Sequence, residues 1–272
     1  MLPMLRLCHA SIKDQGVDYE HIVVDGKSAD GTPQWLSENK TITSVSEKDN
    51  GMYDALNKGI GMARAEIIGH LNCDEQYLPG ILKFVIDFFE RNPAVDFIAA
   101  DFLVINPSGE FVAYRKSFQP RWPYFFSNYL YTTTCTLFYR RKIFDACRFD
   151  HSYKSIADVI FLYNVIKQGF KGTHIPKYFS VFTYSGTNLS LNPISGLEKK
   201  QFNQTLPLWY RMLKPFFFIM FFVERILHGT YTEKPLLSYA IYTSNSTRER
   251  ITLTKTHPGF RLKFKPSQVH SD

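Results

Sequence analysis

Two apolar runs in this sequence end in polar side chains of the types that hold charged ligands. The polar residues are Asp25, Ser28 and Asp30 after the first run, and Asn72, Asp74 and Glu75 after the second. In open α/β sheets, ligands bind just beyond the carboxyl ends of the strands. Carboxylate oxygens at that edge suit Mg²⁺ or Mn²⁺ that bridges to substrate phosphates. The clusters predict a ligand site, while Asp74 and Glu75 by themselves also fit a polar loop that caps the next helix.

A third group of polar side chains lies on one face of a predicted helix. Asp54, Asn57 and Lys58 are spaced i, i+3 and i+4, which brings them together near the start of that helix. The carboxylate and the amide can hold sugar hydroxyls, while the lysine and the helix amino terminus attract a phosphate. The alternative is an ordinary surface ion pair between Asp54 and Lys58.

Asp158 begins a further predicted helix, at residues 156–168. The helix dipole favours a negative charge at that position. The carboxylate therefore suits a general base, and the alternative is a carboxylate that only stabilises the helix start.

The elements that position these residues alternate between strands and helices. Apolar spacing predicts helices at residues 3–12, 32–38, 53–63, 79–91 and 156–168. It predicts strands at residues 19–24, 41–45, 66–71, 97–105, 110–114, 135–139 and 172–184. The turn at residues 106–109 makes two of these strands a hairpin. The order indicates an α/β fold with a mixed, mostly parallel sheet flanked by helices.

Length and composition indicate one main domain. The 272 residues, of which 44% are hydrophobic, can bury one substantial core, and we expect a domain at residues 1–198 with an extension at residues 199–272. The four cysteines lack metal-binding or redox spacing, and the amino terminus lacks a secretory leader pattern. A reducing, cytoplasmic location is the expectation.

The extension at residues 199–272 is basic, with 12 of the 32 Lys and Arg residues and four of the 25 acidic ones. Its stretch at residues 206–227 predicts an amphipathic helix, whose continuous apolar core at residues 215–223 is too short to cross a bilayer. Such a helix suits an anionic membrane surface, on the inner face of the plasma membrane. The alternative is packing on the rest of the chain or on a second subunit.

Nucleic-acid binding is not expected, because no stacking motif or zinc site accompanies the basic residues. The sequence predicts partial order at best for residues 229–243 and 248–265.

The order of the motifs resembles family 2 glycosyltransferases with the GT-A fold. The matching segments are residues 20–32, 46–59, 71–74 and 157–158, and the resemblance covers about residues 4–185. It implies an inverting, metal-dependent enzyme of the hexosyltransferase kind. Such an enzyme moves a sugar from a nucleotide-diphosphate donor to a glycan or lipid-linked glycan in surface polysaccharide or glycolipid biosynthesis.

The resemblance also implies roles for the polar residues. Its substrate-binding positions are Asp25, Ser28, Asp30, Asp54, Asn57, Lys58 and Asn72. Asp74 matches the ligand of Mg²⁺ or Mn²⁺, with Glu75 beside it as a second candidate ligand. Asp158 matches the base that deprotonates the acceptor.

Four features depart from the family pattern. Asn72 stands where Asp is usual, Glu75 stands where Asp is common, and residues 134–136 stand where relatives often have a histidine. Relatives also begin with a strand and a base-binding loop, whereas this sequence starts at the following helix. A start site assigned too far downstream is one explanation. The other is a truncated, non-catalytic homologue that binds a membrane or a partner. The sequence does not specify the donor, acceptor, linkage or oligomeric state.

Overall fold

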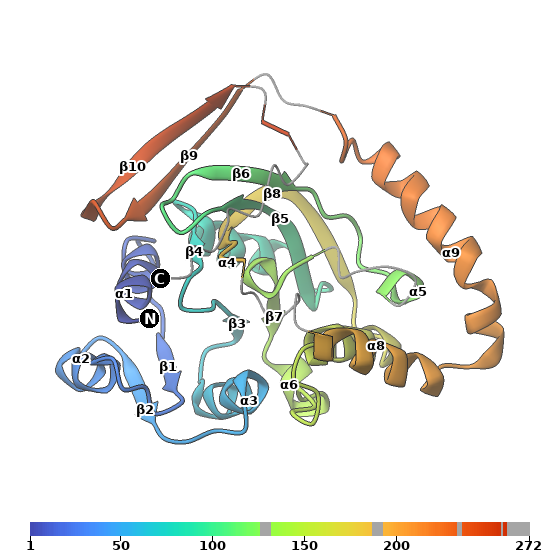
Figure 1. Cartoon of the computed structure of the whole chain (residues 1–272), viewed down its shortest axis with the longest axis horizontal. Helices are drawn as coiled ribbons and strands as arrows, with labels where there is room; N and C mark the ends of the chain where they lie inside the picture. The colour runs from blue at the N-terminus through green and yellow to red at the C-terminus, as the bar shows by residue number, and fades with distance from the viewer. Residues whose placement is uncertain (126–131, 187–192, 233–235, 257, 260–272) are drawn as a thin grey trace, which may run out of the picture.

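The structure is a computed structural model, and it describes residues 1–125, 132–186, 193–232, 236–256 and 258–259. Figure 1 shows a central sheet surrounded by helices, with a β-hairpin and a long helix at opposite sides of the molecule.

The helices predicted from apolar spacing are confirmed, with ends that shift by one or two residues. The described helices are α1 (Leu2–Lys13), α2 (Thr32–Glu38), α3 (Met52–Met62), α4 (Ile81–Arg91), α5 (Trp122–Phe125), α6 (Lys142–Ala146), α7 (Ala157–Lys167), α8 (Pro193–Thr205) and α9 (Leu208–Leu227). The described strands are β1 (Ile22–Asp25), β2 (Thr43–Ser46), β3 (Ile67–Gly69), β4 (Gln76–Tyr77), β5 (Phe97–Ile105), β6 (Phe111–Arg115), β7 (Phe138–Arg140), β8 (Gly172–Thr183), β9 (Leu236–Thr243) and β10 (Ser246–Thr256).

The central sheet is mixed, as the hairpin turn predicted. Its strands follow the order β3-β7-β5-β8-β4, and β6 pairs with β5. Among the described strands of this sheet, only β5 and β8 pair in parallel, and the other pairs are antiparallel. Parallel pairing is therefore rarer among the described strands than the sequence suggested, because β6 and β7 both run opposite to β5.

Side chains on β5 alternate between the two faces of the sheet. Phe97 and Ala99 belong to a cluster that includes α7 residues such as Phe161, whereas Ile98 and Ala100 belong to a second cluster that includes residues of α1 and α4. All four β5 side chains are fully buried. Helices thus cover both faces, as expected of an α/β fold.

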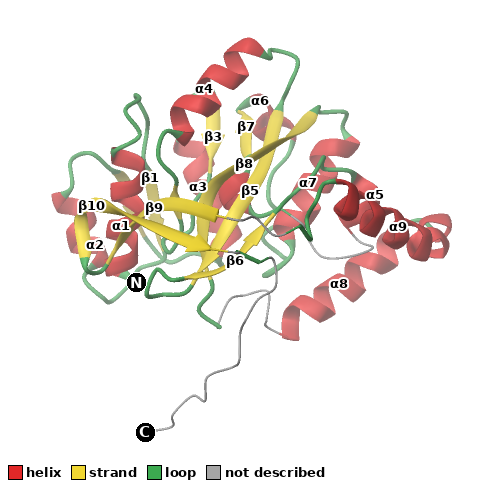
Figure 2. Cartoon of the chain, turned by 90° about the horizontal axis from the view of Figure 1, so that it is seen from above, coloured by secondary structure: helices red, strands yellow, loops and turns green. Residues whose placement is uncertain are grey.

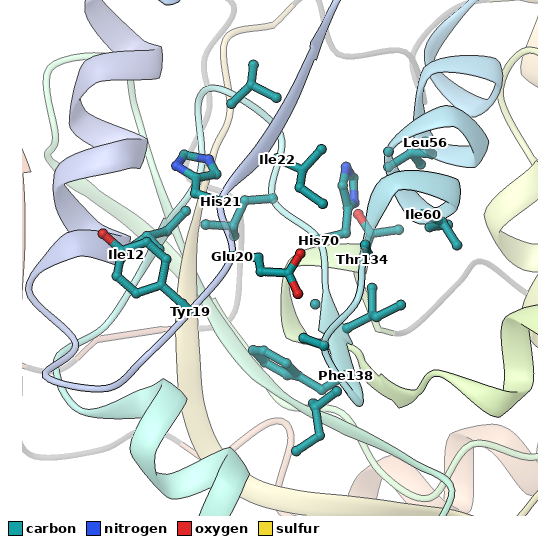
Figure 3. Close-up of a pocket in the computed structure, with 18 of the residues that line it drawn as sticks. Ile12, Tyr19, Glu20, His21, Ile22, Leu56, Ile60, His70, Thr134 and Phe138 are labelled. Carbon is teal, nitrogen blue, oxygen red and sulfur yellow. The ribbon is translucent and has the colours of Figure 1, made fainter. Parts of the chain in front are cut away.

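β1 and β2 form a separate parallel two-stranded sheet. A cavity of about 620 Å³ is lined by residues of both β1 and β3, and also by α1 and α3 (Figure 3). Most of the lining side chains are apolar, including Ile12, Ile22, Leu56, Ile60 and Phe138. Among the described residues, no strand pairing joins β1 to β3. The loop that follows β1 is instead held by hydrogen bonds to β2 and to α1.

The C-terminal strands correct one expectation. The sequence predicts little order at residues 229–243 and 248–265, but β9 and β10 form an antiparallel hairpin; residues 260–265 lie outside the described part of the chain. Leu237, Tyr239 and Ile241 are buried against the α1 and α4 side of the core. The Arg250 guanidinium pairs with Asp14 and donates to a backbone carbonyl of β4. Contacts with α1, β4 and the core therefore fold the β9–β10 segment, which its basic charge had suggested would stay largely in solvent.

Helices α8 and α9 lie at the end of the molecule opposite α1 and α2 (Figures 1 and 2). Only Leu206 and Pro207 separate them. Leu206 and Tyr210 are buried in the same cluster as α7, and the predicted boundary between residues 198 and 199 falls inside α8. In the part of the chain that the structure describes, no helix is long and apolar enough to cross a membrane.

Candidate active site

Asp25 is the last residue of β1, and it is 6% exposed. Its Oδ2 accepts hydrogen bonds from the Ser28 backbone N–H at 3.0 Å and from the Ser46 hydroxyl at 2.6 Å. Burial disfavours the charge, but hydrogen bonds from Ser28 and Ser46 outweigh burial and lower the pKa of Asp25. The carboxylate thus shapes the turn after β1 and joins it to the end of β2.

Asp30 is exposed and joins the same loop to α1. Its carboxylate accepts hydrogen bonds from the amino group of Met1 and from the backbone N–H of Leu2, and it also accepts the Thr32 hydroxyl. The contact with the amino group, followed by that with Thr32, lowers the pKa of Asp30. Both predicted carboxylates of this loop are therefore ionised at neutral pH and held by hydrogen bonds, some within the loop and some to β2 and α1.

Asp54 and Lys58 lie together on α3, as their spacing predicted. The Lys58 ammonium is 3.6 Å from Asp54 and 2.7 Å from Glu47, in the loop after β2. The hydrogen bond to Glu47 raises the pKa of Lys58, and the backbone N–H of Asn50 lowers the pKa of Asp54. The first two turns of α3 therefore present a carboxylate and a cation side by side.

Asn57, one turn along α3, is engaged with the backbone of Phe149. Its Nδ2 donates to the Phe149 carbonyl at 2.8 Å, and the Phe149 N–H donates to Oδ1 at 3.1 Å. This reciprocal pair joins α3 to the segment between α6 and α7. An amide can make further hydrogen bonds beyond these two, so substrate binding by Asn57 stays a prediction.

Asn72 and Glu75 are hydrogen-bonded to each other in the turn between β3 and β4. The Asn72 backbone N–H donates to Oε2 of Glu75 at 2.7 Å, and its Nδ2 lies 3.2 Å from Oε1. Glu75 has no exposed surface, and burial raises its pKa to about 8. The predicted second metal ligand therefore points into the protein interior.

Asp74 differs from its neighbour Glu75 in both exposure and bonding. Its side chain is partly exposed, and burial raises its pKa. No side-chain hydrogen bond or ion pair to another described residue involves this carboxylate. Thr183, at the end of β8, donates its hydroxyl to the Asp74 backbone carbonyl. Among the described residues, no group of three or more His, Cys, Asp or Glu side chains is placed to hold a metal ion.

Asp158 lies in the first turn of α7, and it is joined to the start of α3. The Tyr53 hydroxyl is 3.2 Å from Oδ1 of Asp158 and 3.1 Å from the Ser155 carbonyl. Burial raises the pKa of Asp158 to about 6, although hydrogen bonds from the Val159 N–H and from Tyr53 lower it. A carboxylate with this pKa is ionised at neutral pH and is well matched to removing a proton there.

The loops that carry these residues adjoin one another. A Cβ atom on Gly26 would lie 2.8 Å from Asp49 Oδ2, so the loops after β1 and β2 are in close contact. The Lys154 ammonium, just before α7, donates to the Asn50 carbonyl. The structure therefore brings the Asp25 loop, the start of α3 and the start of α7 into one continuous rim.

Sequence reasoning missed two residues of this rim. Tyr53 precedes Asp54 in a motif, but its hydroxyl contact with α7 has no local signal. Glu198 of α8 accepts hydrogen bonds from the segment before α7, and nothing in the sequence around Glu198 indicates such a role.

Solved structures share this fold. Part of S. aureus TarS, residues 1–349 in complex with UDP, is 18% identical with a TM-score of 0.53, over 66% of this chain and 56% of that chain. The longer S. aureus TarS structure is 14% identical with a TM-score of 0.59, and the match covers 95% of this chain and 58% of that chain. The chain thus spans somewhat more than half the length of these TarS structures.

A third similar structure is the mannosyltransferase PcManGT from Pyrobaculum calidifontis, in complex with GDP-Man and Mn²⁺. It is 15% identical with a TM-score of 0.51, over 83% of this chain and 84% of that chain. No curated protein sequence matches this one. The family model described as glycosyl transferase family 2 matches residues 2–149, which is more than half of the chain and includes the loops after β1, β2 and β3. The chain therefore belongs to glycosyl transferase family 2.

Proposed function

We propose that this protein is an inverting transferase that moves a sugar from a nucleotide-diphosphate donor to an acceptor hydroxyl. The observation that carries the proposal is the contact between Tyr53 and Asp158. It joins a carboxylate with a pKa of about 6 to the helix that presents Asp54. In a family 2 glycosyl transferase, this contact supports the assignment of a base suited to neutral pH beside the predicted donor face.

The donor binds along the rim formed by the loops after β1 and β2 and by the start of α3. Asp25, Ser28 and Asp30 contact the nucleotide. Asp54 and Lys58 contact sugar hydroxyls and the diphosphate, to which the amino terminus of α3 adds its positive dipole end. Structures of TarS with UDP-GlcNAc and of PcManGT with GDP-Man support a donor of this class.

Asp74 fits the role of a ligand to Mg²⁺ or Mn²⁺. Its carboxylate is partly buried without a charged or hydrogen-bonded side-chain partner among the described residues, and hard oxygen ligands of this kind suit both ions. Glu75 is fully buried and bonded to Asn72, so we assign it to the support of the turn. When bound, the ion offsets the negative charge that develops on the leaving diphosphate.

Asp158 acts as the general base. It takes the proton of the acceptor hydroxyl while the acceptor oxygen forms a bond to the anomeric carbon of the donor sugar. The bond from that carbon to the diphosphate oxygen breaks, and the diphosphate leaves with the electron pair. Attack from the face opposite the leaving group inverts the anomeric configuration.

The acceptor is a glycan or lipid-linked glycan at an anionic membrane surface, within surface polysaccharide or glycolipid assembly. Twelve of the fifteen exposed large apolar side chains of the described chain lie on α9. They are Leu208, Trp209, Met212, Leu213, Phe216, Phe218, Ile219, Met220, Phe222, Val223, Ile226 and Leu227. Arg211 is exposed on the same helix. Apolar and aromatic surface next to basic charge is typical of helices that lie in a membrane interface.

The test is turnover of UDP-, GDP- and dTDP-sugars by the purified protein with Mg²⁺ or Mn²⁺ and a lipid-linked glycan acceptor. We expect one donor to release its nucleoside diphosphate and to give a product of inverted anomeric configuration, read by NMR. No turnover, together with no metal-dependent nucleotide binding, would favour the alternative of a non-catalytic homologue that binds a membrane or a partner.

A further inference from the structure

We infer that Glu198 of α8 is a positioning residue for Asp158, which rests on the proposed role of Asp158 as the base. Glu198 is 7% exposed. Its carboxylate accepts hydrogen bonds from three consecutive backbone N–H groups, those of Lys154 at 2.6 Å, Ser155 at 2.9 Å and Ile156 at 3.3 Å. Glu198 therefore holds the segment that leads directly into α7.

The N-cap residue of α7 has no capping side chain, although Asp158 accepts the Val159 N–H within the first turn. Ile156 occupies the N-cap position, and no side chain of that position accepts a hydrogen bond from the first turn. Backbone N–H groups at a helix start need acceptors from elsewhere. The Glu198 carboxylate supplies an acceptor for the N–H of Ile156 and for the two before it. A negative charge near the amino terminus of α7 also interacts favourably with the helix dipole.

The segment held by Glu198 is also the segment that holds Tyr53. The Tyr53 hydroxyl lies within hydrogen-bond distance of both the Ser155 carbonyl and Asp158. The Ser155 N–H is bonded to Glu198, so one residue connects α8 with α3. Glu198 thus fixes Asp158 without a hydrogen bond to it, through the backbone of residues 154–156 and through Tyr53.

Several charged or titratable groups act electrostatically with Asp158 from the elements packed around it. They are Tyr53 from α3, Tyr139 from β7, and Lys199 from α8. The Lys199 ammonium lowers the pKa of Asp158, although burial is the larger influence and raises it. Because Lys199 follows Glu198 directly, a displacement of α8 would change both the position of Asp158 and its charge environment.

Glu198 also explains why the C-terminal helices belong to the catalytic unit. α8 continues after two residues into α9, where Tyr210 is fully buried and its hydroxyl donates to the Pro123 carbonyl. The α8–α9 pair is therefore anchored at Glu198 and again at Tyr210. The position of the base depends on a segment that lies beyond the residues matched by the family model.

The test compares Glu198→Gln and Glu198→Ala with Glu90→Ala, which removes an exposed glutamate of α4. We expect Glu198→Ala to lower kcat by at least about 10-fold, because small misplacement of a catalytic group is costly. The KM for the donor should stay nearly unchanged, and the acidic limb of the pH profile should move. Glu198→Gln keeps one oxygen acceptor and should recover part of the loss. Glu90→Ala should match the wild type.

A second measurement does not need turnover. Amide hydrogen exchange should accelerate at residues 154–156 in folded Glu198→Ala, and the pKa of Asp158, followed by NMR of its carboxyl carbon, should change. The inference is wrong if amide exchange at residues 154–156 and the pKa of Asp158 both stay at wild-type values in Glu198→Ala. It is also wrong if kcat and the pH profile of Glu198→Ala both match the wild type. An inactive wild type would instead contradict the proposed function, while exchange and the Asp158 pKa would still decide whether Glu198 positions this residue.

Discussion

Tyr53 and Asp158 are 105 residues apart in the sequence, yet the Tyr53 hydroxyl lies 3.2 Å from the Asp158 carboxylate. Tyr53 is 2% exposed, and the negative charge of Asp158 acts together with burial to raise the pKa of its hydroxyl. Tyr53 therefore stays protonated and can donate to Asp158. The contact joins the start of α3, where Asp54 lies, to the start of α7.

Replacing Tyr53 with Phe should raise the pKa of Asp158, because the hydrogen bond from Tyr53 favours the ionised carboxylate. A hydrogen bond to a charged group is worth about 1.5 kcal/mol, which corresponds to about one pH unit. We expect the acidic limb of kcat against pH to move upward by that amount, with more activity lost at pH 6 than at pH 8. Tyr19→Phe is the control, and a Tyr53→Phe profile that coincides with the wild type would contradict this role.

Asp158→Asn should abolish the general base without removing donor binding. We expect kcat to fall by about 10²–10⁴-fold, the usual contribution of a positioned base, with little change in nucleotide affinity measured by calorimetry. Wild-type kcat should rise as the pH increases through about 6, because Asp158 must be ionised to accept a proton. Asp145→Asn, on the exposed side of α6, should keep wild-type activity. Retained activity in Asp158→Asn would place the base elsewhere.

Asp74→Asn should weaken the metal dependence of donor binding. Replacing even a supporting residue around a metal typically costs about 10- to 100-fold in affinity, so we expect at least about a 10-fold loss. Titration of nucleotide binding with Mn²⁺ measures the change, and Asp145→Asn again serves as the control. A Mn²⁺ response equal to that of the wild type would exclude Asp74 as a ligand.

Glu75 should make the protein less stable as the pH rises. Its pKa is raised by burial from 4.5 to about 8, so between these values the folded state binds a proton that the unfolded state has released. The free energy of unfolding then falls with increasing pH across that window. Glu75→Gln, which cannot ionise, should flatten the change in Tm between pH 5 and pH 8, whereas Glu90→Gln should leave the slope as it is. If Tm changes equally with pH in the wild type and in Glu75→Gln, folding does not raise the pKa of Glu75, and the prediction is wrong.

The exposed face of α9 should bind anionic vesicles. Flotation with phosphatidylcholine vesicles that contain phosphatidylglycerol should recover the wild-type protein, and pure phosphatidylcholine should recover less. The double variant Phe216→Ser and Ile219→Ser should lose this binding, because it removes apolar surface that would enter the interface. Leu197→Ser, an exposed residue of α8, should bind like the wild type. Loss of self-association by the double variant with no change in flotation would favour the subunit-contact alternative.

Much of the fold follows from local sequence patterns. α1 to α4 and α7 form where apolar residues recur at helical spacing, and Asp54 and Lys58 meet because residues four apart share a helix face. Local signals also placed Asp25 at a strand end. They did not predict the order of β9 and β10, since Arg250 finds its partners on α1 and β4.

By itself, the sequence determined which polar residues stand at the ends of strands and starts of helices, because that depends on spacing within one segment. Tertiary structure decided how these groups are used. Glu75 is buried against Asn72 while Asp74 beside it stays partly exposed, and Glu198 accepts the N–H of Ile156, the N-cap residue of α7. Burial and charge pairing depend on what other segments bring into contact, and they set pKa values and positions that no local pattern encodes.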